Sequence, residues 1–162
     1  MPHIVLHQPE IPPNTGNIIR LCANTGTNLH LIHPLGFTMT KKSLRRAYLD
    51  YEEFAKITHH NNIKEMNEHF SGRGYYAVST KGKTLFNTVK FKESDIFLFG
   101  SETEGLPKNA LSSKNCLGVL RVPMVEGSRS INLANTVSVA VSYTHLRAHE
   151  TRHDLVCRLL LE

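Results

Sequence analysis

Residues 120–141 read L-R-V-P-M-V-E-G-S-R-S-I-N-L-A-N-T-V-S-V-A-V. An apolar strand ends at Pro123, a polar loop containing Gly127 follows, and small and β-branched residues then recur at helical spacing. We expect Asn132 or Ser130 to cap that helix. Free N–H groups at a helix start, beside a loop with hydroxyl groups, offer a polar cradle for a ligand. Taken alone, the stretch fits an ordinary strand-loop-helix joint better than a binding site.

Upstream of this stretch, short strand patterns alternate with helix patterns. The predicted strands are Ile4–Leu6, Leu29–Ile32, Tyr75–Thr80 and Asp95–Phe99. The first helix is predicted to begin at Asn14, because the prolines at positions 12 and 13 are expected to block helix before it, and to stop at Gly26. Further helices are predicted at residues 62–70 and after Pro107. This alternation predicts an α/β fold with a mainly parallel sheet and flanking helices.

Length and composition limit the class of protein. The 162 residues suit one domain, and 40% apolar with 20% charged residues is typical of a soluble globular chain. No apolar run reaches the roughly 18 residues that cross a bilayer, and no signal peptide follows Met1, so we expect a cytoplasmic protein without a membrane partner. Three cysteines without a C-x-x-C pair are expected to be reduced and structural. The formal charge of +5 weakly favours a polyanionic partner.

Four cations fall within six positions, with no acidic residue among them. They are Lys41, Lys42, Arg45 and Arg46. On a short helix, i,i+4 spacing places them on one face. That face is either simply solvated or binds phosphate, because clustered Lys and Arg side chains contact nucleic-acid backbones.

Two other stretches place polar residues next to predicted strand ends. Asn14, Asn17 and Arg20 recur every three residues on one face of the first helix, where they are either solvated or line a site at the end of the first strand. The strand that ends at Phe99 runs directly into G-S-E-T-E-G-L-P, residues 100–107. The two glycines in this loop let the backbone approach a ligand closely.

The C-terminal region contains one short catalytic pattern. Residues 149–153 read H-E-T-R-H and match the H-E-x-x-H pattern of zinc proteases. No third ligand is identifiable, and the pattern arises readily by chance in a chain with ten histidines, so we predict no metal site. The glycines of residues 100–105 match neither the dinucleotide nor the nucleoside-triphosphate pattern, and no G-x-S-x-G elbow is present. These three classes of chemistry therefore lack support.

Three stretches in this order and spacing closely resemble the SPOUT RNA methyltransferases. They are N-T-G-N-I-I-R-L-C-A-N-T-G at 14–26, F-L-F-G-S-E-T-E-G-L-P at 97–107, and the run from Val122 to Val141 quoted above. Within that superfamily they are most similar to the small TrmL (YibK-type) group, which methylates the ribose of the tRNA wobble nucleotide, cytidine or modified uridine. The resemblance extends from about Pro2 to Val141.

The resemblance implies a fold, a cofactor and partners. The fold would be an α/β sheet whose C-terminal segment threads a loop as a deep trefoil knot, which sequence physics alone would not propose. The cofactor would be S-adenosylmethionine, the RNA partner a tRNA anticodon stem-loop, and two subunits would form a homodimer that completes the active site. By the same resemblance, the basic residues at positions 41, 42, 45 and 46 would grip the RNA.

The resemblance also implies which residues form the site. The cofactor would be bound by Val78, Ser79, Gly100, Gly105, Val122, Met124, Ser130 and Leu133. The catalytic group would be Asn14, Arg20, Glu102, Ser130 and Asn132. Because a guanidinium is a poor base, our hypothesis is that Arg20 binds a flanking phosphate and polarises the hydroxyl, leaving its proton to phosphate, water or Glu102.

The sequence departs from the family pattern after Val141. We therefore divide the chain into a methyltransferase domain, residues 1–141, and an atypical C-terminal tail, residues 142–162, with a non-native junction between them. This departure leaves alternatives open: a catalytically impaired RNA-binding SPOUT protein, or a 2′-O-methyltransferase that acts at another RNA position. Metal-dependent hydrolysis through the tail histidines is a third, and it would require activity that chelation removes.

Overall fold

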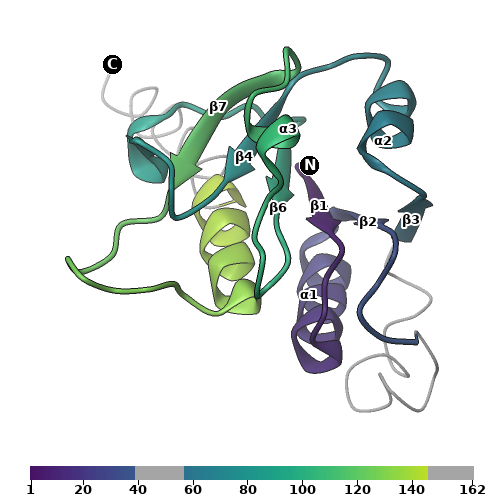
Figure 1. Cartoon of the computed structure of the whole chain (residues 1–162), viewed down its shortest axis with the longest axis horizontal. Helices are drawn as coiled ribbons and strands as arrows, with labels where there is room; N and C mark the ends of the chain where they lie inside the picture. Colours follow the sequence, from purple (N-terminus) through teal and green to yellow (C-terminus); the bar gives the residue numbers. More distant parts are fainter. Residues whose placement is uncertain (39–56, 146–162) are drawn as a thin grey trace, which may run out of the picture.

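The computed structural model describes residues 1–38 and 57–145 (Figure 1). Its strands are β1 His3–His7, β2 Asn28–Ile32, β3 Ile57–His60, β4 Tyr75–Val78, β5 Thr84–Leu85, β6 Ile96–Phe99 and β7 Cys116–Arg121. Its helices are α1 Pro12–Thr25, α2 Ile63–His69, α3 Lys108–Leu111, the short 3-10 helix η1 Phe86–Thr88, and a helix that includes residues 133–145.

All seven strands join one sheet in the order β3-β2-β1-β6-β4-β7-β5. Every strand pair in it is parallel. The predicted α/β fold is therefore confirmed. The predicted strands correspond to β1, β2, β4 and β6, and the apolar strand predicted before Pro123 corresponds to β7, which ends at Arg121. Because parallel strands all end at the same edge, the segments that follow β1, β4, β6 and β7 leave the sheet together.

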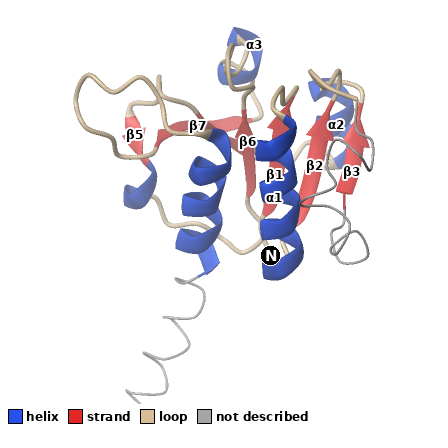
Figure 2. Cartoon of the chain, turned by 90° about the horizontal axis from the view of Figure 1, so that it is seen from below, coloured by secondary structure: helices blue, strands red, loops and turns tan. Residues whose placement is uncertain are grey.

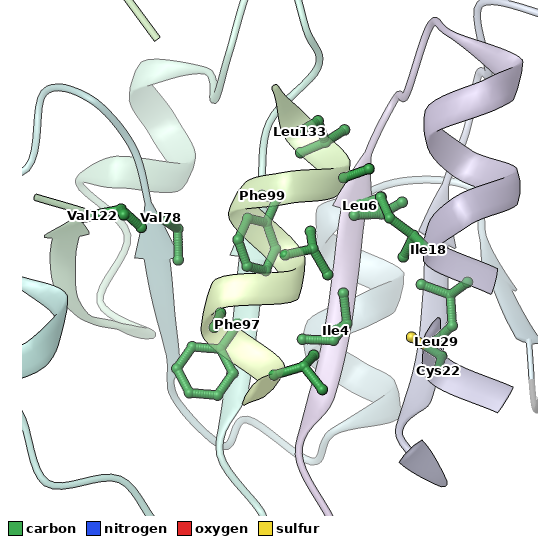
Figure 3. Close-up of a cluster of buried hydrophobic side chains, with 14 of the residues drawn as sticks. Ile4, Leu6, Ile18, Cys22, Leu29, Val78, Phe97, Phe99, Val122 and Leu133 are labelled. Carbon is green, nitrogen blue, oxygen red and sulfur yellow. The ribbon is translucent and has the colours of Figure 1, made fainter. Parts of the chain in front are cut away.

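One face of the sheet is covered by α1 and by the helix at 133–145, which stand side by side in Figure 2. Between them and the sheet lies the larger hydrophobic core, which Figure 3 shows around Phe97 and Phe99 of β6. Cys22 of α1 is buried in this core, and burial raises the pKa of its thiol to about 12. As predicted, this cysteine is a packing residue.

Helix α1 begins two residues earlier than the sequence predicts. The structure starts it at Pro12, with both prolines in the first turn. A proline there loses no hydrogen bond, because the first N–H groups of a helix have no intrahelical partner, and its fixed φ suits the helix. The predicted block before Asn14 is therefore wrong. The predicted stop is confirmed, since Gly26 ends the helix in the left-handed conformation with φ of 67°.

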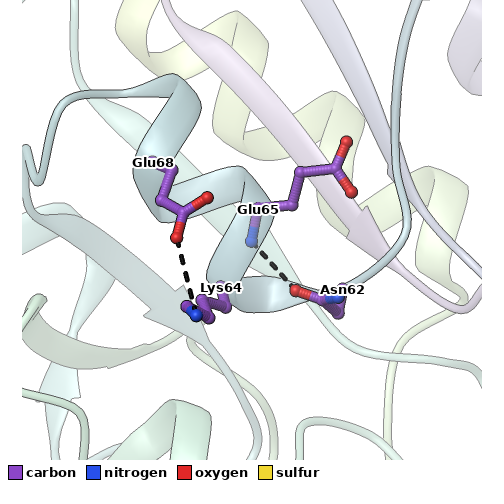
Figure 4. A network of polar contacts seen from close by, with 4 residues as sticks. All are labelled: Asn62, Lys64, Glu65 and Glu68. Atoms are coloured by element: carbon purple, nitrogen blue, oxygen red, sulfur yellow. Dashed lines mark hydrogen bonds and ion pairs between the residues drawn. The ribbon is translucent and has the colours of Figure 1, made fainter.

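The other face of the sheet is covered by α2 and α3. Helix α2 has only seven residues, and Met66 and Phe70 anchor it to the smaller core. The Asn62 side chain caps it by accepting a hydrogen bond of 2.9 Å from the Glu65 N–H, and Lys64 lies 3.9 Å from Glu68 one turn along (Figure 4). The predicted helix at 62–70 is thus confirmed, with its first and last residues acting as caps.

Several predicted features lie outside the described residues. The basic cluster at 41–46 falls in one gap, and the H-E-x-x-H pattern falls in the other. The trefoil knot and the boundary at Val141 stay predictions. Within residues 1–38 and 57–145, no helix is both long and apolar enough to cross a membrane.

Candidate active site

A cavity of about 490 Å³ opens where the parallel strands end. Its walls come from the start of α1, the turn after β4, the loop after β6, and residues 121–136. This is the position where open parallel α/β sheets bind ligands, outside the carboxyl ends of the strands. Its volume lies within the range of roughly 300–1,000 Å³ of small-molecule and cofactor pockets.

All but one of the predicted cofactor and catalytic residues meet in this cavity. Every predicted cofactor residue lines it: Val78, Ser79, Gly100, Gly105, Val122, Met124, Ser130 and Leu133. Four of the five predicted catalytic residues line it as well: Asn14, Glu102, Ser130 and Asn132. Residues that are far apart in sequence are therefore gathered at one place in the fold.

Glu102 ties the loop after β6 to the start of α1. Its carboxylate accepts hydrogen bonds from the backbone N–H groups of Glu10 at 2.8 Å and Ile11 at 3.3 Å. It also accepts one of 2.9 Å from Nδ2 of Asn14. These donors precede or begin the helix, where N–H groups lack intrahelical partners and a negative charge is favoured. Glu102 thus fixes both the entry to α1 and the orientation of the Asn14 amide.

Asn132 extends this network to the C-terminal helix. Its Nδ2 donates a hydrogen bond of 2.9 Å to Oδ1 of Asn14. Its Oδ1 accepts from the N–H groups of Ala134 at 2.9 Å and Asn135 at 3.3 Å. Asn132, rather than Ser130, is therefore the helix cap that the sequence left open between them. Each of the two asparagine amides keeps one N–H beyond those this network uses.

The loop after β6 is folded tightly against itself. A Cβ atom on Gly100 would lie 2.1 Å from the carbonyl carbon of Gly105, and Gly105 has a φ of 71°. The Gly105 N–H donates to the carbonyl of Ser101 at 3.1 Å. Only glycine fits both positions without strain, so backbone rather than side chains forms this wall.

Arg20 is the one predicted catalytic residue that the cavity does not include. It lies on the exposed side of α1, six residues after Asn14. Asn17 is also exposed, so the polar face predicted for this helix turns only Asn14 into the cavity. The structure does not bring Arg20 to the cavity of its own chain.

Three cations that sequence reasoning did not single out also line the cavity. They are Lys81, Arg121 and Arg129. Arg129 sits inside the motif at 122–141, so its position next to Ser130 was an available signal. Lys81 and Arg121 gave none, because only the strand order brings the turn after β4 beside the end of β7.

The residues present suit a cofactor with both apolar and polar parts. Buried apolar side chains from β4, the β6 loop, β7 and the C-terminal helix form part of the wall, namely Val78, Leu106, Val122 and Leu133. The glycine loop contributes backbone that a Cβ atom would fill. Hydroxyl and amide side chains complete the wall at Ser79, Ser130 and Asn132. An apolar pocket with a few fixed polar groups is the usual form of a cofactor site, and S-adenosylmethionine fits this donor set.

Two curated proteins that are similar to this chain carry the same description. A tRNA (cytidine(34)-2′-O)-methyltransferase of Methylovorus glucosotrophus is 48% identical over 147 residues, which cover 91% of this chain and 95% of that protein. The protein of that description from Escherichia coli K12 is 49% identical over 141 residues, 87% of this chain and 90% of its own length.

Two solved structures are also similar to this chain. One from a study of "the 2-OH methylation of C/U34 on tRNA" superposes with a TM-score of 0.86 at 38% identity, covering 93% of this chain and 97% of that one. The SpoU methyltransferase AviRb from Streptomyces viridochromogenes, solved with AdoMet, has a TM-score of 0.75 at 20% identity, covering 91% of this chain and 57% of that one. This second likeness concerns the fold alone.

The model of the SpoU rRNA Methylase family matches residues 1–142. That span contains the whole sheet, the cavity and every predicted site residue. With the full-length relatives at nearly half identity, the match establishes that the chain belongs to the SpoU rRNA Methylase family, within the SPOUT methyltransferases.

Proposed function

We propose that this protein is a tRNA ribose methyltransferase that transfers a methyl group from S-adenosylmethionine to the 2′-hydroxyl of nucleotide 34, cytidine or modified uridine. The observation that carries this function is the meeting of the three family motifs around one cavity. Asn14, Gly100 and Asn132 come from different motifs, and all three line it. The coverage of full-length tRNA methyltransferases by this chain supports the substrate.

The chain's own residues account for orientation in this reaction. S-adenosylmethionine, when bound, supplies a methyl group that is already strongly electrophilic. The protein must therefore hold the ribose hydroxyl in line with that group and stabilise the charge that develops on its oxygen. The free N–H of Asn14 and that of Asn132 are the donors we assign to the sugar, because Glu102 and the helix cap hold both amides in one orientation.

We assign Glu102 a positioning role rather than the acceptance of the hydroxyl proton. Its carboxylate already accepts hydrogen bonds from two backbone N–H groups and from Asn14. Protonation of the carboxylate would weaken all of them. The proton then passes to a phosphate oxygen or to water, the other two acceptors that the chemistry allows.

We propose a homodimer, which would give the exposed Arg20 a role in the site of the partner subunit. The side chain is exposed and lies outside its own cavity. The resemblance to the family nevertheless implies that Arg20 belongs to the catalytic group. In a twofold dimer, an exposed arginine of one subunit can reach the site of the other. Arg20 would then bind a phosphate next to the target ribose with its planar, bidentate guanidinium.

The protein would bind its RNA through the basic cluster and act in the cytoplasm. The basic cluster at 41–46 would hold the anticodon stem-loop, since clustered cations bind the phosphate backbone. The enzyme would act in the cytoplasm, where its tRNA substrate is found.

The direct test is to map the methylated nucleotide. Purified protein is incubated with bulk tRNA and S-adenosylmethionine carrying a labelled methyl group, and the labelled nucleotide is located by nuclease digestion and mass spectrometry. We expect label on the ribose of nucleotide 34. Label at another position would overturn the proposed substrate, and RNA binding without methyl transfer would overturn the enzymatic assignment.

A further inference from the structure

The rim of the cavity carries positive charge that the proposed chemistry has not used. Lys81, Arg121 and Arg129 are all exposed and all line the cavity, which places them at its mouth. Within the part of the chain that the structure describes, none of the three has a carboxylate partner within 4 Å; the ion pair found there joins Lys64 and Glu68 on the opposite face of the sheet. These cations, which we name the rim cations, are therefore available to a ligand.

Two of the rim cations are brought together by backbone contacts. The Ser79 N–H donates a hydrogen bond of 2.9 Å to the carbonyl of Leu120, and the Gly82 N–H closes the turn onto the Ser79 carbonyl at 3.0 Å. A Cβ atom on Gly82 would lie 2.6 Å from the carbonyl carbon of Leu120. The turn that carries Lys81 is thus packed on the end of β7, where Arg121 is the last residue.

The third rim cation comes from the loop between β7 and the C-terminal helix. A turn closed by the Ser128 N–H and the Val125 carbonyl at 3.1 Å precedes Arg129, and Gly127 within it has a φ of 82°. Arg129 is followed directly by Ser130 and stands three residues before the helix cap. The loop therefore places Arg129 in the lining of the cavity that also contains Asn132, one of the two donors that we assign to the sugar.

The charges of the cavity are divided between its two sides. Glu102 and Glu104 belong to the loop after β6, and the Glu102 carboxylate faces α1. The rim cations belong to the turn after β4, to β7 and to the loop that follows it. A ligand that suits this arrangement has a neutral part for the amides and anionic groups for the rim, which describes a nucleotide within an RNA strand, with one phosphate on each side of its ribose.

We propose that Lys81, Arg121 and Arg129 form a phosphate-binding site at the mouth of the cavity, which holds the RNA backbone on either side of the ribose to be methylated. The inference rests on the proposed function and adds to it a second RNA contact, distinct from the predicted cluster at 41–46. Cations that contact phosphates release counterions from RNA, so each contact contributes to the salt dependence of binding.

The test measures the affinity for an anticodon stem-loop RNA over a series of NaCl concentrations. The variants are Arg129→Gln and the double variant Lys81→Gln/Arg121→Gln. The matched control is Lys92→Gln/Lys114→Gln, which removes the same charge from segments that precede β6 and β7 and so lie at the opposite edge of the sheet. Calorimetry with S-adenosylmethionine alone provides the second readout.

We expect the slope of log K against log salt to fall by about one for each phosphate contact removed. The control should keep the slope of the unmodified protein, and all variants should keep their affinity for S-adenosylmethionine. An unchanged slope in the rim variants would overturn the proposal. So would a loss of cofactor affinity that parallels the loss of RNA affinity, because the cations would then bind the cofactor.

A missing phosphate site can be distinguished from a missing methyltransferase activity. If the unmodified protein methylates nucleotide 34 while the rim variants keep its salt slope, only the phosphate site is wrong. If the unmodified protein transfers no methyl group to tRNA, the proposed function fails before any variant is compared.

Discussion

Asn132 and Asn14, 118 positions apart in sequence, are joined by a hydrogen bond of 2.9 Å from Nδ2 to Oδ1. The same Asn132 side chain caps the C-terminal helix with its oxygen. The Asn132 amide therefore has two roles, one for its nitrogen and one for its oxygen, and a substitution can remove one role while keeping the other. The cap needs an acceptor, whereas the link to Asn14 needs a donor.

Replacing Asn132 by Asp should keep the helix cap and remove the link. A carboxylate accepts the N–H groups of Ala134 and Asn135 as well as the amide does, and a negative charge at a helix start is favourable. It cannot donate to Asn14, however, so we expect an unfolding temperature near that of the unmodified protein and a fall in the rate constant of methyl transfer. The Asn132→Ala variant should lose the cap too, at about 1 kcal/mol of stability. Thermal unfolding and single-turnover methyl transfer distinguish the two, and full turnover in Asn132→Asp would contradict the role of the link.

Gly100→Ala should damage the cavity wall directly. The added Cβ would lie 2.1 Å from the Gly105 carbonyl carbon and 2.4 Å from the Leu106 nitrogen, and neither backbone atom can rotate away. We expect a loss of about 1–3 kcal/mol in unfolding free energy, the usual range for overpacking, and a marked loss of calorimetric affinity for S-adenosylmethionine.

A matched glycine provides the control for that substitution. At Gly118 of β7 the nearest atom to a new Cβ is Cδ1 of Tyr76 at 3.8 Å, which is ordinary contact. Gly118→Ala should therefore bind the cofactor with unchanged affinity. Equal effects at the two positions would show that the close approach at Gly100 does not shape the cavity.

The sequence predicts most of the sheet and of the cavity, because apolar runs mark most strands and the family motifs contain most residues of the cavity wall. The strand before Gly100 is four consecutive buried apolar residues, and the cap at Asn132 is visible as a polar residue before a helical pattern. Strand β3 was not predicted, because its sequence lacks an apolar pattern. Its one buried residue is His60, a polar side chain. The presence of Lys81 and Arg121 in the site was not predicted either. They come together through the pairing of β4 with β7, which no local sequence pattern encodes.

The inward-facing histidines of β3 and its neighbours should make stability sensitive to acid. His30 bonds to His3 at 3.1 Å and to His60 at 3.0 Å, and the ring of His69, the exposed last residue of α2, packs against the rings of His30 and His60. Burial, followed by the charges of the other three rings, lowers the pKa of His30 to about 3. Burial also lowers the pKa of His3 and that of His60, with Arg73 adding to the effect at His3 and Glu65 opposing it at His60.

Because the pKa values of these histidines are lowered in the folded state, the free energy of unfolding should decrease as the pH falls. In the unfolded chain a histidine has a pKa near 6.5, so between pH 6.5 and about 3 the unfolded state binds protons that folded His30 does not. Stability is complete above pH 6.5 and should fall as the pH drops, by at most about 1.4 kcal/mol per pH unit for each such histidine. Urea titrations from pH 7 to pH 4 measure this slope. It should be shallower in His30→Gln than in His33→Gln, which removes a histidine outside the set His3, His30, His60 and His69, and equal slopes would contradict the assignment.

Arg20 is exposed on α1 and lies outside the cavity of its own chain. If Arg20 acts in the cavity of the partner subunit, Arg20→Ala and Asn132→Asp damage different halves of one composite site. A heterodimer of the two variants then contains one site in which Arg20 and the cavity are both intact. In an equal mixture half of the dimers are mixed and half of their sites are complete, so roughly one quarter of the unmodified rate should return.

Co-expression with two affinity tags isolates the heterodimer for assay. A chain carrying both substitutions, paired with Arg20→Ala, provides the control and should restore nothing. A heterodimer that forms but remains as inactive as its parents would place Arg20 in its own chain's chemistry, and the composite site would have to be abandoned.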